Sequence, residues 1–264
     1  MTLSPEDQQQ LALAAKILEH PAFMSSLTRK MGRTVEKVIG ILPDQLSGSI
    51  TNITRTALEK SLEGALFTLK PKKTSGKYPK THQWLAGLSG AVGGSFGLAA
   101  LAVELPLSTT IMFRSIAEIA RNNGEDIQSP ATKMACLEVF ALSDATNKPS
   151  SETGYYAIRS LLAKSLSDAA SQISVQGLNL QGSPALVNAI NKIAARFSIP
   201  VSEKLAAQSV PIIGAIGGAT VNLLFIRYFQ EIADAHFTIR RLERKYSPKT
   251  IKKMYQKIIA KQLS

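Results

Sequence analysis

The ionisable residues beside two long uncharged stretches are the candidates for chemistry in this chain of 264 residues. Glu104 stands alone among apolar and small residues in AALAVELPLSTTIMF, where a carboxylate is costly unless it is paired or neutralised. Arg114 is too distant for a contact along one helix, so only the tertiary fold can bring it or Arg227 to Glu104. We expect these side chains to converge on a polar site, whose candidate residues are Glu104, Arg114, Glu118, Arg227, Glu231 and His236.

Two interpretations of this polar site stay open. In the functional one it acts on lipid or peptide, as a hydrolase with a Glu/Arg/His centre. In the structural one it is a buried ion-pair network that fixes the register of neighbouring helices, because such networks also perturb charges without doing chemistry. An apolar pocket beside these residues would favour the functional interpretation.

No other motif in the chain indicates a reaction, and the catalytic residues of an enzyme are not identifiable. His20, His82 and His236 are the only histidines, and none has the HExxH spacing of a metal site, so we expect no metal and no cofactor. Cys136 lies among apolar residues, as a small buried thiol does, and a single cysteine excludes an internal disulfide. Ser89 lies between glycines of an apolar helix rather than in a strand-turn-helix nucleophile elbow.

The two uncharged stretches run from Thr81 to Val103 and from Leu205 to Ile226, and each has the length that crosses a bilayer core. Glycines four residues apart give each stretch a small-residue face on which another helix can pack closely. The glycines assigned to this packing are Gly90, Gly93, Gly94, Gly97, Gly214, Gly217 and Gly218. An alternative is an integral membrane hairpin in which residues 82–103 and 210–226 span the bilayer.

The stretches also resemble one another, which indicates a degenerate internal duplication. GAVGG at 90–94 matches GAIGG at 214–218, and FRSIAEIAR from Phe113 resembles IRYFQEIAD from Ile226. This alignment pairs Arg114 with Arg227 and Glu118 with Glu231.

The net charge of +12 is confined to two segments rather than spread over the chain. Residues 70–80 hold five lysines and no acid, namely Lys70, Lys72, Lys73, Lys77 and Lys80. Residues 240–264 hold nine basic residues and one acid. Local positive charge of this kind indicates an anionic partner at defined places.

Residues 248–264 are expected to form a basic amphipathic helix that starts at Pro248. Apolar residues recur along one stripe from Ile251 to Ile259, and four lysines recur on another face: Lys249, Lys253, Lys257 and Lys261. Such a helix suits an anionic membrane surface. The alternative is a terminal helix docked on its own bundle with solvated lysines. Nucleic acid fits poorly, since neither basic segment has interleaved aromatic residues or a known reading module.

The pattern along the chain predicts an all-α, multi-helix bundle with two central glycine-rich apolar helices, in a single domain over residues 1–264. Predicted helices cover 5–19, 22–41, 44–68, 82–103, 105–122, 130–143, 152–175, 183–197, 200–209, 211–245 and 248–262. Ser4 and Pro5 open the first of them as N-cap and first helical residue. No region shows sustained strand alternation.

Several stretches in order along the chain resemble the bacterial EcsC protein family. They are ELPLSTTIMFRSIAEIARNNGEDI from Glu104, ACLEVFAL from Ala135, SETGYYAIRSLLAK from Ser151, and VPIIGAIGGATVNLLFIRYFQEIADAHFTIRRLERKY from Val210. The resemblance covers roughly residues 30–250. It implies a single bacterial domain in an envelope-related context, because the family takes its name from a protein encoded beside an ABC transporter, and it brings no catalytic residues with it.

These observations together predict a non-enzymatic protein that associates with membranes. We expect it to be cytoplasmic and peripheral to the inner face of the membrane, where its basic segments bind anionic lipid or a membrane protein. The oligomeric state is not determined by the sequence.

Overall fold

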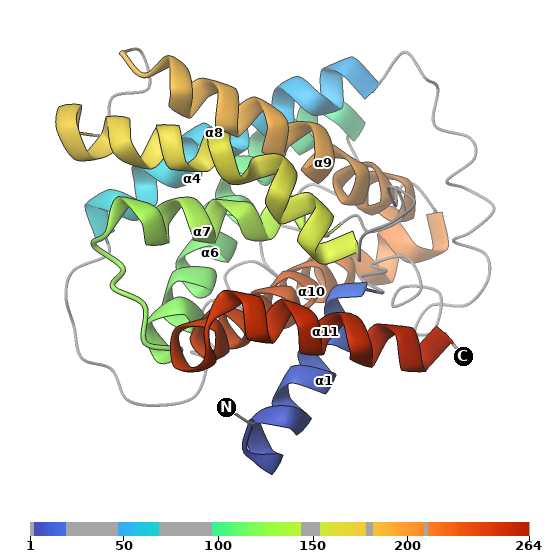
Figure 1. The fold of residues 1–264 in the computed structure, drawn as a ribbon. Helices are drawn as coiled ribbons and strands as arrows, with labels where there is room; N and C mark the ends of the chain where they lie inside the picture. Colours follow the sequence, from blue (N-terminus) through green and yellow to red (C-terminus); the bar gives the residue numbers. More distant parts are fainter. Residues whose placement is uncertain are drawn as a thin grey trace.

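The computed structural model describes residues 3–19, 47–68, 97–143, 154–177, 182–208 and 211–263, with the backbone alone for 65–68, 211–219 and 262–263. Within these ranges the chain forms helices joined by short turns and no strand, which confirms the predicted all-α bundle (Figure 1). The helices are α1 (Pro5–Glu19), α4 (Ser47–Thr68), α6 (Gly97–Asn122), α7 (Pro130–Ala141), α8 (Gly154–Gln176), α9 (Pro184–Gln208), α10 (Pro211–Tyr246) and α11 (Pro248–Leu263).

Two predicted helix breaks are wrong, because α6 continues through Pro106 and α9 continues through Pro200. Proline removes one backbone hydrogen bond and leaves the carbonyl four residues earlier without its usual partner. For Pro106 that carbonyl belongs to Ala102, which is exposed, so water can hydrogen-bond to it. Leu101 and Leu105 are buried in the same core, and their packing holds this part of α6 in one helix despite the proline.

The core is centred on α7, which is buried along almost its whole length and contacts α6, α8, α9 and α10. A helix that is apolar on nearly all sides belongs in the interior of a bundle. Phe140 of α7 packs against Phe197 of α9 and Phe229 of α10, with ring centroids 4.8 Å and 5.3 Å away. The one acid of α7, Glu138, is therefore brought deep into the molecule.

Side chains from other helices satisfy the carbonyl groups at the end of α7. Arg196 Nε of α9 donates to the carbonyl of Ala141, and the Tyr228 hydroxyl of α10 donates to that of Ser143. The last carbonyls of a helix have no partner within it, so these bonds fix the position of α7 between its neighbours.

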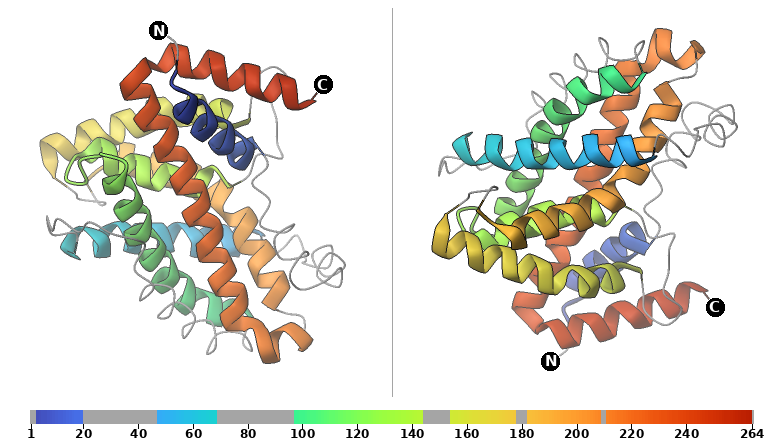
Figure 2. Two further views of the ribbon diagram at one scale, coloured as in Figure 1. Left: turned by 90° about the horizontal axis from the view of Figure 1, so that it is seen from below. Right: turned by 90° about the horizontal axis from the view of Figure 1, so that it is seen from above.

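The long helix α10 runs across the molecule, and α1 and α11 pack at the end where it finishes (Figure 2). Ser4 caps α1 as predicted, since its Oγ accepts a hydrogen bond from the backbone N–H of Asp7 at 3.2 Å. Asp7 in turn accepts hydrogen bonds from Lys245 and Tyr246 at the end of α10, both at 2.7 Å. The start of the chain is thus anchored to the last turn of α10.

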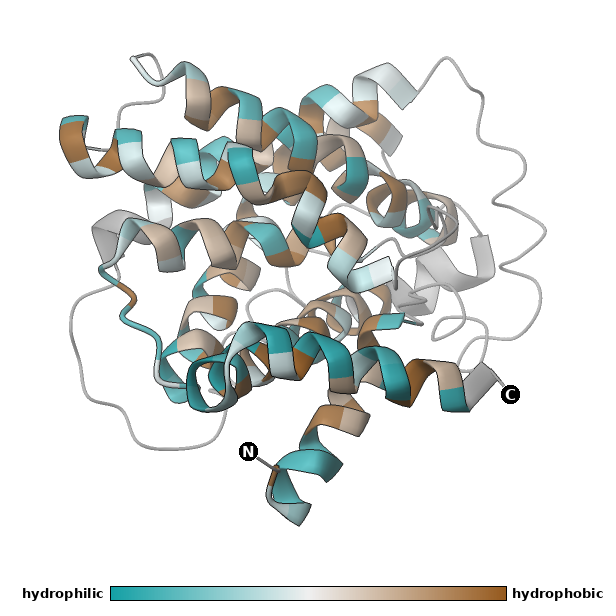
Figure 3. Ribbon diagram, in the orientation of Figure 1, coloured by the Kyte–Doolittle hydropathy of each residue, from teal (hydrophilic) through white to brown (hydrophobic). Residues whose placement is uncertain are grey.

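The apolar stripe of α11 packs on the protein itself. Ile251 and Tyr255 are fully buried and Ile259 is 6% exposed, while Met254 and Ile258 pack against the same core. Hydrophilic residues run along most of the rest of α11 (Figure 3). The predicted amphipathic helix is present, and the bundle covers its apolar face.

One helix of the described part of the chain, α6, is long and apolar enough to cross a membrane by length and composition alone. Its most apolar stretch is 56% buried in the bundle, and core helices of globular proteins pass the same test. The integral hairpin stays a prediction, because residues 82–96 of its first span lie outside the described residues.

Candidate functional site

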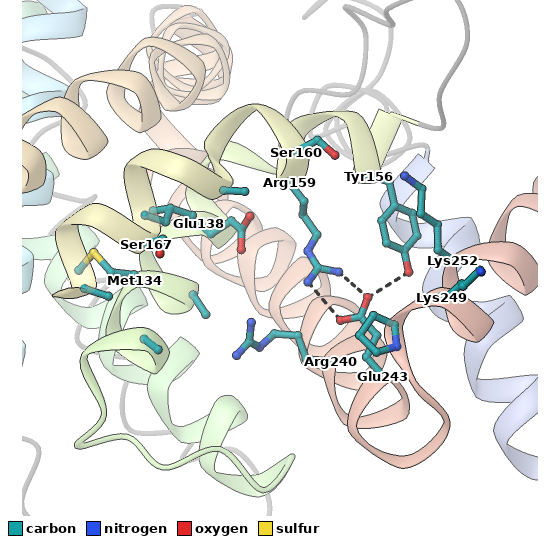
Figure 4. Close-up of a pocket in the computed structure, with 16 residues that line it drawn as sticks. Met134, Glu138, Tyr156, Arg159, Ser160, Ser167, Arg240, Glu243, Lys249 and Lys252 are labelled. Atoms are coloured by element: carbon teal, nitrogen blue, oxygen red, sulfur yellow. Dashed lines mark hydrogen bonds and ion pairs between the residues drawn. The ribbon is translucent and has the colours of Figure 1, made fainter.

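A cleft of about 680 Å³ opens between α7, α8, the last turns of α10 and the start of α11 (Figure 4). Its lining combines small and apolar side chains with six charged ones. The charged residues are Glu138, Arg159, Arg240, Glu243, Lys249 and Lys252. A cleft of this size with a few convergent polar groups has the usual form of a small-molecule site.

Glu138 enters the cleft from α7, the most interior helix. Only 5% of the residue is exposed, and its carboxylate makes no hydrogen bond with any described residue. Burial raises the pKa of Glu138 to about 6, although the nearby Arg159 and Arg240 act to lower it. The carboxyl group therefore changes its protonation state close to neutral pH.

His236 of α10 lies behind Glu138 and is fully buried. Its Nε2 is 3.7 Å from Oε2 of Glu138, and its Nδ1 is 3.0 Å from the hydroxyl of Tyr155. Burial, together with the positive charges of Arg159 and Arg240, holds the pKa of His236 well below its usual value, so the imidazole is neutral. When Tyr155 donates to Nδ1, the imidazole hydrogen is on Nε2 and faces Glu138.

Arg159 and Glu243 form the next wall of the cleft. Arg159 donates two parallel hydrogen bonds to the Glu243 carboxylate, at 2.7 Å and 3.1 Å, and the Tyr156 hydroxyl donates a third at 3.2 Å. Figure 4 shows these three bonds between α8 and α10. A bidentate pair of this kind is rigid, so the charges of Arg159 and Glu243 cancel in a fixed place.

Arg240 also lines the cleft, and a carboxylate that lies outside the cleft holds its guanidinium by two hydrogen bonds. Its guanidinium donates to both carboxylate oxygens of Glu125, at 2.9 Å and 3.2 Å, and Arg244 donates to the same carboxylate. Burial alone would raise the pKa of Glu125, but the hydrogen bonds and charges of these arginines hold that pKa below its usual value.

The basic edge of the cleft is set by the turn between α10 and α11. Ser247 there has a φ of 77°, an uncommon conformation for a residue other than glycine, and its Oγ accepts a bond from the N–H of Thr250. This turn sends α11 back across the bundle and places Lys249 and Lys252 at the cleft. The Lys252 ammonium lies 5.5 Å from the centroid of the Tyr156 ring.

A family model matches residues 8–242 of the chain, which is most of its length, and this model describes the EcsC protein family. The chain belongs to the EcsC protein family. No curated protein and no solved structure matches it.

The cleft of this EcsC family protein is built largely from the stretches that carry the resemblance. Glu138 comes from ACLEVFAL, and Tyr156 and Arg159 come from SETGYYAIRSLLAK. Arg240 and Glu243 come from HFTIRRLERKY, the same turns of α10 that hold His236. The family match ends before α11, so Lys249 and Lys252 lie outside it.

Of the six predicted site residues, His236 lies next to the cleft and Glu104 lies elsewhere. Glu104 pairs with Lys204 of α9, whose Nζ donates to both carboxylate oxygens at 2.9 Å. Lys204 is fully buried and also lies 4.9 Å from the Phe225 ring centroid. The carboxylate does have the partner that its apolar surroundings require, and this partner is neither Arg114 nor Arg227.

The remaining four predicted residues lie on the helices α6 and α10, which pack against each other. Arg114 and Glu118 are half-buried on α6, whereas Arg227 and Glu231 are exposed on α10. A hydrogen bond joins these two helices, since Gln230 of α10 donates to the Ser115 hydroxyl of α6 at 2.7 Å. No described contact joins these four side chains to the cleft.

Several other predicted residues lie outside the described residues or in a stretch where only the backbone is described. Lys70, Lys72, Lys73, Lys77, Lys80, Gly90, Gly93 and Gly94 lie there. Gly214, Gly217 and Gly218 are helical in α10, where only the backbone is described, and Gly97 begins α6 with a φ of 63°. The proposed close packing of the two glycine faces therefore stays a prediction.

The described residues contain no group of three or more His, Cys, Asp or Glu side chains that could hold a metal ion. Cys136 is buried, and burial raises the pKa of its thiol above the ordinary value, so it is an unreactive core residue.

Sequence reasoning missed Glu138, Tyr155, Arg159, Arg240 and Glu243 as members of one site. One signal was present, because Glu138 is an acid within the apolar run ACLEVFAL, as Glu104 is within its own run. The arginines carried no such signal, since they follow ordinary helical spacing in α8 and α10.

Proposed function

We propose that this EcsC family protein binds anionic membrane surfaces peripherally, through the exposed lysines of α11. The observation that supports the proposal is the division of α11 into a buried apolar stripe and an exposed basic face. The exposed lysines are Lys249, Lys253, Lys257 and Lys261, and α11 contains no acidic residue.

Ion pairs within the protein separate this face from the rest of the basic tail. Arg240 and Arg244 pair with Glu125, while Lys245 and Arg241 lie 2.7 Å and 3.8 Å from Asp7. The two carboxylates offset two of these four positive charges. Of the two parts of the basic tail, α11 therefore carries the larger positive excess, because it contains five lysines and no acidic residue.

The docked apolar stripe determines the kind of binding. Because Ile251 and Tyr255 are fully buried, α11 would have to leave the bundle before it could insert into lipid. Contact through lysines alone is electrostatic, contributes about 1 kcal/mol for each lysine near the surface, and weakens as salt screens the charges.

Vesicle flotation with the full chain tests the proposal. We expect binding at low salt to phosphatidylcholine vesicles that contain phosphatidylglycerol, no binding to phosphatidylcholine alone, and release at high salt. The triple variant Lys253→Gln, Lys257→Gln, Lys261→Gln should weaken binding roughly 100-fold. A matched triple variant on other helices, Lys16→Gln, Lys164→Gln, Lys192→Gln, should bind like the parent protein.

Two outcomes would contradict this function in different ways. Failure to bind protein-free anionic vesicles at low salt would remove lipid as the partner and leave a membrane protein with an acidic surface. Binding that survives high salt would indicate insertion of apolar residues instead of contact through lysines.

A second candidate function, hydrolysis of a lipid or peptide bond, is favoured by the apolar cleft beside Glu138 and His236. Glu138 would act as the general base toward a water molecule, with a pKa near the working pH. Hydrolysis of p-nitrophenyl octanoate tests this function. Activity that Glu138→Gln abolishes and Glu104→Gln retains would support it, and an inactive parent protein would count against it.

A further inference from the structure

The two ends of the cleft differ in polarity. At the α7 and α8 end the lining is Met134, Ala135, Leu166 and Ala170, with Ser167 beside them. At the other end are Arg159, Glu243, Lys249 and Lys252, and Figure 4 shows Met134 and Ser167 on the opposite side of the space from Glu243, Lys249 and Lys252. Such a cleft complements a molecule that is apolar at one end and charged at the other.

The charge of the polar end favours an anion. Arg159 is neutralised by Glu243, and Arg240 is neutralised by Glu125. Lys249 makes no ion pair with any described residue, and Lys252 adds a second positive charge at the same edge. Glu138 is the remaining acid of the lining.

Glu138 adds a polar group that a ligand in the cleft can reach. Its carboxyl group makes no hydrogen bond to the described residues, and its oxygens are not among the fully buried atoms that lack a partner, so they are accessible from the cleft. Since Glu138 lies on the cleft wall between the apolar and the basic end, its protonated carboxyl group can donate a hydrogen bond to an oxygen of an anionic head group.

We propose that this cleft binds a single-chain anionic amphiphile, with its chain along α7 and α8 and its head group at Lys249, Lys252 and Glu138. The volume of about 680 Å³ is within the range of small-molecule sites and fits one such molecule. This site goes beyond the proposed surface binding and does not rest on it. The two share Lys249, but Lys252 belongs only to the cleft and Lys253 only to the outer face.

Calorimetric titration of the full chain with octyl sulfate, below its micelle concentration, tests the proposal. We expect saturable binding of one molecule per chain. Inorganic sulfate, which has the head without the chain, and 1-octanol, which has the chain without the charge, should each bind at least about tenfold more weakly.

Neighbouring substitutions give matched controls for both ends. Lys252→Gln should weaken octyl sulfate binding about tenfold, whereas Lys253→Gln, the same change one residue along α11, should leave it unchanged. Ser167→Trp fills the apolar end and should abolish binding. Ser171→Trp, one turn further along α8 and also exposed, should not. Circular dichroism and urea unfolding establish that each variant is folded.

Several results would overturn the proposal, whatever happens with vesicles. They are the absence of saturable binding, equal affinity for 1-octanol, retention of affinity in Ser167→Trp, and equal losses in Lys252→Gln and Lys253→Gln. Loss of vesicle binding in the Lys253, Lys257 and Lys261 triple variant, with octyl sulfate binding intact, would show that the cleft and the outer face are separate sites.

Discussion

The hydroxyl group of Tyr255 in α11 donates a hydrogen bond to the carboxylate of Glu19 at the end of α1, across 2.9 Å. The same carboxylate accepts bonds from the backbone N–H groups of Gly154 and Tyr155, at 3.0 Å and 3.2 Å. A carboxylate at the N-terminus of a helix satisfies its free N–H groups and interacts favourably with its dipole. Glu19 therefore ties together the first helix, the last helix and the start of α8, next to the cleft.

The first prediction concerns this junction. Tyr255→Phe should lower the free energy of unfolding by about 1 kcal/mol, and Glu19→Gln by about 2–3 kcal/mol because charged hydrogen bonds are lost. Urea unfolding measures both. Glu6→Gln, an exposed acid on the same helix, is the control and should change little. A Glu19→Gln variant as stable as the parent protein would show that α8 does not depend on this cap.

The second prediction is the pH dependence of the Asp7 contact. Hydrogen bonds from Lys245, Tyr246 and Ser4 hold the pKa of Asp7 well below its ordinary value of 3.8. An acid with a lowered folded-state pKa contributes stability above its ordinary pKa, and this contribution disappears as the pH falls toward the folded-state pKa. Asp7→Asn should therefore destabilise the protein more at pH 6 than at pH 3.

Urea unfolding of the parent protein and Asp7→Asn at the two pH values measures this difference. Asp168→Asn is the matched control, because the Asp168 side chain is half exposed and pairs with Lys164 one turn away. It should change stability by well under 1 kcal/mol at either pH. A cost for Asp7→Asn that does not vary with pH would show that its effect is not electrostatic.

The third prediction has the opposite sign and concerns Glu138. Its folded-state pKa of about 6 lies above its ordinary value of 4.5, so the folded protein binds the proton more tightly than the unfolded chain does. Stability is then lost as the pH rises through this window, because ionised Glu138 is buried. The charged and titratable groups that face Glu138 are Arg159 from α8 and His236, Arg240 and Glu243 from α10.

Glu138→Gln removes this ionisation and should stabilise the protein at pH 8 relative to pH 4, by about 2 kcal/mol. Urea unfolding of parent and variant between pH 4 and 8 measures the change. A constant difference over this range would mean that Glu138 does not titrate in it. Because ionised Glu138 also repels an anion, octyl sulfate should bind more weakly above pH 6 in the parent protein, and Glu138→Gln should remove that dependence.

The fourth prediction separates the Glu104 and Lys204 pair from the cleft. Removing one partner leaves an uncompensated buried charge, so Glu104→Gln or Lys204→Met should each cost about 3–5 kcal/mol of stability. The double variant Glu104→Leu, Lys204→Met should recover most of that loss. Octyl sulfate binding by folded Glu104→Gln should match the parent protein, and its loss would instead place Glu104 in the functional site.

Local patterns in the sequence were sufficient to predict most of the helices. Capping residues, prolines and apolar spacing act within one or two turns, so α1, α10 and α11 begin where Pro5, Pro211 and Pro248 predict. The stripe of Ile251, Tyr255 and Ile259 was identifiable for the same reason, since helical spacing alone puts these residues on one face. The predicted helix breaks at Pro106 and Pro200 are wrong because buried residues on both sides of each proline hold the helix in place. Their packing outweighs the backbone hydrogen bond that the proline removes.

The sequence by itself determined that Glu104 needs a cation and that the tail from Arg240 is basic. Only the tertiary structure decided that the cation is Lys204, that Glu125 and Asp7 pair with the first part of the tail and offset half of its charge, and that Glu138 faces a cleft. The physical reason is the distance along the chain over which each kind of interaction acts. Helix formation depends on neighbours three or four residues apart, whereas ion pairs and clefts depend on which faces of distant helices meet.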